Sequence, residues 1–144
     1  MPANPPENMP RVTPYLYGED VASALDWLAR AFGFRERMRI AGADGKITHA
    51  EVELADGVVM MGHPGPDYRN PRRLGRVTQS LYVYVDDVDK HFEAARAAGA
   101  KILEAPAYQF YGDRRYGAED PEGHRWYFAQ HVRDVAPEDM KPVT

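Results

Sequence analysis

The chain has 144 residues, which is enough for one domain with a substantial core. Its formal net charge of −4 gives no electrostatic reason to expect binding to nucleic acid or to an anionic membrane. The sequence contains no cysteine, and this excludes disulfides, thiolate catalysis and zinc–thiolate sites.

The first ten residues are rich in proline and lack the positive charge and apolar run of a signal peptide. No stretch approaches the roughly 20 apolar residues that a membrane span requires. We therefore expect a cytoplasmic, soluble protein whose partners include neither nucleic acid nor a membrane.

The first half of the chain predicts one helix among four strands. Apolar residues that recur at helical spacing indicate the helix, namely Val21, Leu25, Leu28 and Phe32, and Gly33 is its stop. Asp44-Gly45 and Asp56-Gly57 are turn signals between strands. The strands are predicted at about 12–17, 35–40, 47–54 and 58–61.

The second half predicts the same order of elements. Residues 63–76 form a linker, after which a strand at about 80–85 precedes a helix at about 87–98 that ends at Gly99. Val88, Phe92 and Ala95 form the buried stripe of this helix. Three strands follow near 101–105, 113–118 and 124–130. The prediction is one domain over 11–132, with repeat units at about 11–63 and 78–132, an arm at 1–10 and a tail at 133–144.

The two halves are also similar residue by residue, at a constant offset. Thr13, Tyr15, Tyr17, Asp20 and Val21 correspond to residues 67 positions later, namely Ser80, Tyr82, Tyr84, Asp87 and Val88. Each copy begins as an alternating strand, passes an acidic cap and enters an amphipathic helix. Two units are too few for a solenoid, so the repeat predicts two sheets related by a pseudo-twofold axis.

The repeated β-α-β-β-β order is accompanied by one motif before the last strand, Asp120–Pro121–Glu122–Gly123–His124–Arg125–Trp126. Together, the order and the motif resemble those of the vicinal oxygen chelate superfamily. This superfamily includes glyoxalase I, extradiol dioxygenases, fosfomycin-resistance transferases and bleomycin-resistance binding proteins. Residues 48–51 (Thr-His-Ala-Glu) and 112–114 (Gly-Asp-Arg) look most like the branch often labelled PhnB-like. The resemblance implies an α+β fold in which two βαβββ repeats form a cup-shaped mixed sheet, with helices on the outer face. It also implies a small-molecule ligand on the concave side and a homodimer.

Enzymes of this superfamily hold a divalent metal with His and Glu side chains from four strand positions. Carried onto this chain, the positions fall on Thr13, Ser80, Tyr127 and either Met60 or Met61. Hydroxyl, phenol and thioether groups are poor ligands for the divalent ions concerned. We therefore expect no metal and no other cofactor, which separates this chain from the metal-dependent members.

Strand alternation predicts what lines the cup instead. Leu16 has the opposite parity to Tyr15 and Tyr17, and Leu81 and Val83 have the opposite parity to Tyr82 and Tyr84. The aliphatic residues should face the helices and the four tyrosines the cup, together with Tyr127. Tyr108, Phe110, Tyr111 and Tyr116 are candidates for the rim. The alternative is that some tyrosines reflect strand propensity or a dimer contact.

Polar candidates accompany the aromatic residues. His49 and Glu51 share one face of their strand, about 7 Å apart, and are either an acid–base pair or a solvent-facing polar stripe. Arg114 and Arg115, beside Asp113, are candidates for contact with an acidic ligand group or for ion pairs across the dimer. His63, His91 and His131 are interpreted as loop, helix-surface and strand-end residues, and His124 as part of a turn.

Three functions follow from these observations. The first is a binding protein that sequesters an aromatic or hydrophobic molecule, as resistance proteins do. The second is a lyase, isomerase or dioxygenase with a non-standard metal site built from residues such as His49, Glu51 and His63. The third is a metal-free enzyme that uses His49 as its base.

Overall fold

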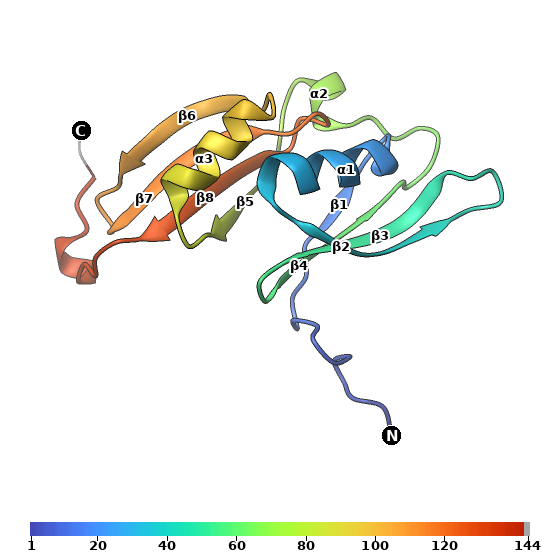
Figure 1. The fold of residues 1–144 in the computed structure, drawn as a ribbon, viewed down its shortest axis with the longest axis horizontal. Helices are drawn as coiled ribbons and strands as arrows, with labels where there is room; N and C mark the ends of the chain where they lie inside the picture. Colours follow the sequence, from blue (N-terminus) through green and yellow to red (C-terminus); the bar gives the residue numbers. More distant parts are fainter. Residues whose placement is uncertain (143–144) are drawn as a thin grey trace.

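The computed structural model describes residues 1–142 of the chain. Its first half contains β1 (Tyr15–Tyr17), α1 (Val21–Phe32), β2 (Arg35–Ala41), β3 (Ile47–Leu54) and β4 (Gly57–Gly62). Its second half contains β5 (Ser80–Tyr84), α3 (Val88–Ala97), β6 (Lys101–Tyr108), β7 (Asp113–Glu119) and β8 (Arg125–His131). The order is βαβββ twice, as Figure 1 shows, and the predicted α+β fold is confirmed.

Each helix begins at the acidic residue that the repeat marked. The Asp20 carboxylate accepts a hydrogen bond from the Ser23 amide at 3.1 Å, and Asp87 accepts one from the Lys90 amide at 3.1 Å. Both contacts satisfy an amide of the first helical turn that has no partner within the helix. The two halves therefore start their helices by the same chemistry.

The strands form two four-stranded mixed sheets of identical topology. The strand orders are β1-β4-β3-β2 and β5-β8-β7-β6. In each sheet the first strand of the repeat pairs in parallel with the last, so Tyr15 lies opposite Met60 as Tyr82 lies opposite Tyr127. This register shows which methionine of β4, Met60 or Met61, lies on the same face as Tyr15. Met61 is buried in the core, and Met60 shares the face of Tyr15.

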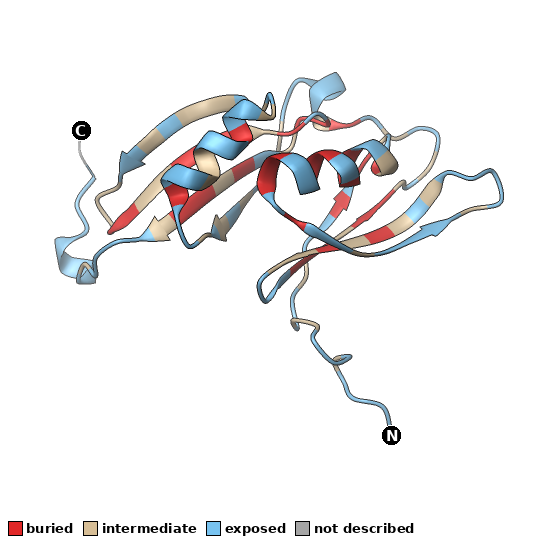
Figure 2. Cartoon of the chain, in the orientation of Figure 1, coloured by how far each residue is buried: buried red, intermediate tan, exposed pale blue. Residues whose placement is uncertain are grey.

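Both helices pack against the same side of the sheets, and one core joins the two repeats (Figure 1). Leu25, Leu28, Phe32 and Val88 are buried there as predicted, and Phe92 is half-buried against them. The Phe32 ring of α1 lies 4.6 Å from the Phe128 ring of β8, measured between centroids. Figure 2 shows the buried residues gathered between helices and sheets. The opposite face of the sheets therefore remains available for a site.

The linker between the repeats is more ordered than the sequence predicted. It contains a short helix, α2 (Pro71–Leu74), and the tail contains a 3₁₀ turn at Pro137–Asp139. Asn70 caps α2 by accepting from the Arg73 amide at 2.9 Å. The tail prediction also covered 143–144, which lie outside the described residues.

A buried carboxylate ties the linker and the second repeat to the first. Glu122, in the turn before β8, accepts hydrogen bonds from the amides of Glu19 and Asp20, each at 2.9 Å. Its carboxylate also accepts from the Asn70 side chain at 2.7 Å. Charge-assisted contacts of this kind fix geometry strongly because both partners are held in place. The Asp-Pro-Glu-Gly turn thus sets how the ends of β1 and β8 lie relative to each other.

Candidate functional site

The face of the sheets opposite the helices carries four tyrosines from the two parallel edge strands. We call the surface formed by Tyr15, Tyr17, Tyr82 and Tyr84 the tyrosine face. Leu16 between the first two is 1% exposed, whereas the four tyrosines are between 41% and 61% exposed. The predicted division of each strand into a core side and an open side is therefore what the structure has.

Cavities connect the tyrosines of the two repeats. One of about 660 Å³ lies between the β1 edge and the β5 edge, and Tyr15, Tyr82 and Tyr84 all line it. Two smaller cavities of about 240 and 260 Å³ adjoin it, each lined by Tyr15 and Tyr17. A volume of this order suits a small organic molecule. All three cavities have Tyr15 in their lining.

In the first repeat, a histidine and a glutamate hold Tyr15. The Tyr15 hydroxyl lies 2.9 Å from His49 Nδ1, and His49 Nε2 lies 3.1 Å from Glu51 Oε2. The pair predicted on β3 is therefore together, next to the aromatic surface. Nearby, Arg37 Nε lies 3.6 Å from Glu51 Oε1 and balances its charge.

In the second repeat, one buried aspartate holds two tyrosines. Asp113 is 2% exposed, and its Oδ2 accepts from the hydroxyls of Tyr82 and Tyr84 at 2.6 and 2.9 Å. Its Oδ1 lies 2.7 Å from His131 Nδ1, and His131 Nε2 lies 2.7 Å from Asp134. The carboxylate is thus surrounded by donors, which is what a buried charge requires.

These contacts shift the ionisation of each member. Burial opposes the charged form of Asp113, but hydrogen bonds from Tyr82, His131 and Tyr84 outweigh it and leave the pKa of Asp113 lowered. Hydrogen bonding to Asp113 and then to Asp134 raises the pKa of His131. Burial, followed by the bond to Asp113, raises the pKa of Tyr82, and the same bond raises the pKa of Tyr84. Both phenols therefore stay protonated.

Beside this network lies a second aromatic and cationic group. Arg115 stands over the Tyr127 ring at 4.9 Å and pairs with Glu104 at 2.8 Å. Its Nη1 donates to the Tyr111 hydroxyl at 3.0 Å. Gly117 permits this packing, because a Cβ there would lie 2.8 Å from the Tyr127 ring. Tyr111 and Tyr127 thus join the edge of the tyrosine face, and Phe110 packs against Tyr111 with 5.1 Å between centroids.

The residues at the family's metal positions do not suit a metal. Ser80 begins β5, Thr13 precedes β1, and Met60 and Tyr127 occupy equivalent places in the two sheets. Their donors are two hydroxyls, a thioether and a phenol, and the Arg115 cation lies over the phenol ring. Within residues 1–142, no group of three or more His, Cys, Asp or Glu side chains is placed to share an ion.

Some predicted candidates lie elsewhere. Arg114 Nη2 pairs with Asp89 of α3 at 2.9 Å, and its guanidinium lies over the Tyr108 ring at 4.6 Å. Both side chains therefore occupy the helix side of β6 and β7, away from the four tyrosines. The prediction that Tyr116 closes the rim is wrong, because Tyr116 is fully buried in the core.

Two histidines have more contacts than the sequence indicated. His91 is not a surface residue of its helix. It is half-buried and lies 2.6 Å from the Tyr116 hydroxyl and 2.8 Å from the Phe32 carbonyl oxygen. Its burial lowers its pKa. His124 lies in the predicted turn and also reaches the Tyr17 carbonyl oxygen at 2.8 Å, which links β8 to β1.

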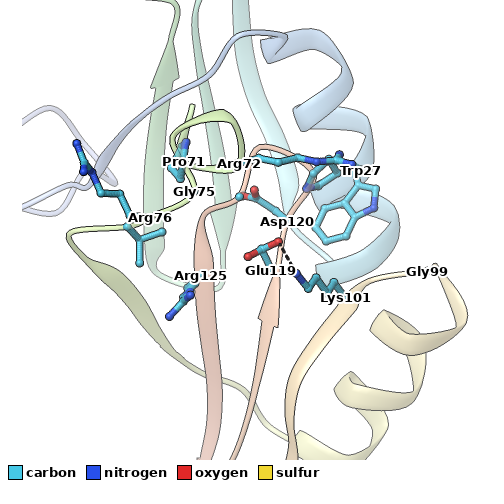
Figure 3. A pocket seen from close by; sticks show the side chains of 13 residues that line it. Trp27, Pro71, Arg72, Gly75, Arg76, Gly99, Lys101, Glu119, Asp120 and Arg125 are labelled. Carbon is cyan, nitrogen blue, oxygen red and sulfur yellow. Dashed lines mark ion pairs between the residues drawn. The ribbon is translucent and has the colours of Figure 1, made fainter. Parts of the chain in front are cut away.

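A separate cavity of about 510 Å³ lies between α1, the linker and the β7–β8 turn (Figure 3). Trp27 forms one wall, and Lys101 pairs with Glu119 at 3.5 Å. The remaining charged residues in its lining are Arg72, Arg76, Asp120 and Arg125. The Asp120 carboxylate is turned toward the protein core, where it accepts a hydrogen bond from the Trp126 indole at 2.9 Å. None of the four tyrosines lines this cavity, so it is distinct from the tyrosine face in position and in charge.

Comparison with known proteins identifies the class. The model of the Glyoxalase/Bleomycin resistance protein/Dioxygenase superfamily matches residues 9–128, and the chain belongs to that superfamily. The predicted superfamily is thereby confirmed, while the PhnB-like branch stays a prediction. Within residues 1–142, no helix has the length and apolarity to cross a membrane.

Individual relatives sharpen the comparison. The chain is 34% identical over 137 residues to the Mycobacterium bovis protein "Uncharacterized protein Mb0911c", covering 92% of this chain and 90% of that one. Its sequence is 36% identical to that of TioX from Micromonospora sp. ML1. The crystal structure of TioX matches the fold with a TM-score of 0.71, over 85% of this chain and 99% of TioX. The fosfomycin resistance protein FosX from Listeria monocytogenes has a TM-score of 0.62 over 92% of this chain and 98% of FosX. At 14% identity that likeness concerns the fold alone.

Proposed function

We propose that the protein binds a small aromatic or hydrophobic organic molecule on the tyrosine face, without a metal ion, and acts by sequestering it. One observation carries the proposal: a cavity of about 660 Å³ joins the two repeats, and tyrosines of both line it. Tyrosine rings offer large apolar area with little entropy to lose on binding. The superfamily's own description includes bleomycin resistance proteins, in line with a sequestering role.

The donor chemistry at the metal positions supports the metal-free part of the proposal. A divalent ion bound at Thr13, Met60, Ser80 and Tyr127 would meet no carboxylate and no imidazole. It would also meet the charge of Arg115, which stands 4.9 Å above the Tyr127 ring. We therefore derive no reaction step that passes through a metal at these positions.

Binding can be tested with a thermal-shift screen of aromatic natural products and thiol–aldehyde adducts, followed by calorimetry on the best compound. Replacing Tyr15, Tyr17, Tyr82 or Tyr84 by Ala should each weaken binding by about 1–2 kcal/mol, the typical contribution of a buried aromatic contact. Tyr108→Ala is the matched control, since this exposed tyrosine lies beside Arg114 on the helix side. The proposal fails if Tyr108→Ala weakens binding as much as the other four changes.

A second candidate function has its own observation. His49, Glu51 and Tyr15 form a continuous hydrogen-bonded series at the edge of the tyrosine face. A histidine oriented by a carboxylate can act as a general base, so a metal-free lyase or isomerase is the alternative. His49→Ala should abolish turnover of a substrate while its binding persists. Turnover that a chelator removes would instead point to an enzyme with a non-standard metal site.

We further propose that the protein is a homodimer in the cytoplasm. The tyrosine face and the apolar residues Met38 and Ile40 on edge strand β2 are exposed in the single chain. Exposed apolar surface on a sheet edge favours association with a partner chain. Light scattering at micromolar concentration should give twice the chain mass, and a monomer mass would contradict the dimer.

A further inference from the structure

Three of the four hydroxyl protons of the tyrosine face are directed into the protein, which leaves them unavailable to a ligand. Tyr82 and Tyr84 both donate to Asp113 Oδ2, at 2.6 and 2.9 Å, and an ionised carboxylate can only accept. Each phenol has a single proton, so neither can donate to a ligand at the same time. The Tyr82 hydroxyl also lies 3.2 Å from the Tyr111 hydroxyl. Beyond that contact, what the Tyr82 and Tyr84 hydroxyls offer a ligand is lone pairs.

The same reasoning applies to Tyr15. Glu51 Oε2 lies 3.1 Å from His49 Nε2, and because a carboxylate accepts, this nitrogen carries the proton. In a neutral imidazole Nδ1 is then an acceptor, so the Tyr15 hydroxyl at 2.9 Å must donate to it. Tyr17 is the exception, because its hydroxyl has no hydrogen-bond partner within residues 1–142 and can donate or accept.

Within residues 1–142, the cavity of about 660 Å³ has no Lys, Arg or His in its lining, and three cations beside the tyrosine face are already engaged. Arg115 donates to Glu104 and to Tyr111, at 2.8 and 3.0 Å. Arg37 lies between Glu51 and Glu53, at 3.6 and 3.9 Å. His131 lies between Asp113 and Asp134, each at 2.7 Å. Of the three cavities at the tyrosine face, Arg69 and Arg76 line only the one of about 240 Å³. Among the described residues, a negatively charged ligand would therefore find no cationic side chain in the lining of the 660 Å³ cavity, which contains Asp56 instead.

We infer that the ligand is an aromatic molecule that carries a cationic nitrogen. The inference rests on the proposed function, since it names the class of ligand for the same surface. Ring faces and phenol lone pairs both present negative electrostatic potential, and a cation over such rings is attracted by it. The buried Asp113 carboxylate adds negative charge behind Tyr82 and Tyr84, which His131 at 2.7 Å offsets only in part.

Three probes of nearly equal shape test the inference by calorimetry near neutral pH and at equal ionic strength. They are N-methylquinolinium as the cation, quinoline as the neutral molecule and quinoline-2-carboxylate as the anion. The cation should bind about 5- to 20-fold more tightly than quinoline, the range that a partly desolvated cation–π contact provides, and the anion most weakly. Equal affinity for cation and neutral probe, with both dependent on the four tyrosines, would overturn the inference and leave the proposed function standing. Failure of all three to bind would overturn both.

Two variants test which groups of the tyrosine face cause the preference for the cationic probe over quinoline. Asp113→Asn removes the charge but keeps the shape, so affinity for the cation should fall severalfold more than affinity for quinoline, and the cation-to-neutral ratio should fall with it. Tyr84→Phe removes one acceptor oxygen but keeps the ring, and it stays informative if Asp113→Asn does not fold. Tyr108→Phe is the control for it and should leave the ratio unchanged. A ratio that neither Asp113→Asn nor Tyr84→Phe lowers would show that the cation binds elsewhere and would overturn the inference.

Discussion

The two halves of the tyrosine face have the same backbone but hold their rings differently. In the first repeat Tyr15 bonds to a half-exposed histidine, which in turn bonds to Glu51. In the second repeat Tyr82 and Tyr84 share a carboxylate that is 2% exposed. The sheet register places the tyrosines at equivalent positions, so the repeat conserves where the rings lie. What fixes the rings differs between the repeats.

This difference has a physical consequence for stability. A buried carboxylate must be matched by donors, so the second half depends on Asp113 and on the groups that donate to it. A half-exposed histidine can exchange its partner for water at small cost. We therefore expect the second half to be rigid and sensitive to substitution, and the first half to be adaptable.

The largest expected effect comes from removing the buried carboxylate. Asp113→Ala leaves the hydroxyls of Tyr82 and Tyr84 and the ring of His131 without their common acceptor. Losing hydrogen bonds to a charged, buried group should lower the free energy of unfolding by about 2–4 kcal/mol, measured by urea denaturation. Asp134→Asn is the control, because Asp134 also contacts His131 but is fully exposed. If the two variants were equally stable, the network would not support the second half.

A smaller effect is expected from pH. Because the pKa of His131 is raised above its ordinary 6.5, its bond to Asp113 contributes fully below pH 6.5 and is lost as pH rises through the raised value. Because the pKa of Asp113 is lowered from 3.8, its contribution is present above pH 3.8 and is lost as pH falls through the lowered value. The stabilising window therefore lies between these two ordinary values. Unfolding curves of wild type and His131→Gln should differ most inside it and converge as pH rises above it. A constant difference across this range would contradict the assignment.

The smallest effect is expected in the first half. His49→Ala removes one partly exposed hydrogen bond to Tyr15, so the free energy of unfolding should fall by less than about 1 kcal/mol. Urea denaturation beside Asp113→Ala measures the contrast directly. A loss as large as that of Asp113→Ala would show that the two halves are equally dependent on their polar partners.

Sequence patterns predicted the elements because the signals are local. Asp20, Asp87 and Gly33 mark helix ends, and β3 occupies the predicted residues 47–54. Parity along single strands likewise predicted the open side of Tyr15 and Tyr82. Strand β6 extends to Tyr108, beyond the predicted 105, because its pairing with β7 continues through two register shifts.

Contacts across strands could not be predicted in this way. Asp113 and Tyr82 are 31 positions apart and meet only because β8 lies between their strands. Tyr116 was expected at the rim, but it has the parity of the core residue Ala118. The position of His91 depends on α1 packing beside α3, which a single helix pattern does not contain. One sequence signal could have indicated the role of Asp113 as a buried acceptor. Asp113 is the first residue of its strand and has the strand parity that faces the cup.

Fluorine NMR of protein labelled with 3-fluorotyrosine tests the central claim most directly, because it observes all nine tyrosines in one spectrum. Resonances would be assigned with Tyr→Phe variants, and spectra recorded with an aromatic ligand from the screen and, separately, with Mn²⁺. Metal-free binding on the tyrosine face predicts that the ligand shifts Tyr15, Tyr17, Tyr82 and Tyr84 but not Tyr108, and that stoichiometric Mn²⁺ broadens none of them selectively. Saturable broadening of Tyr15, Tyr82 and Tyr127 by stoichiometric Mn²⁺ would place a metal at the family position and contradict the claim.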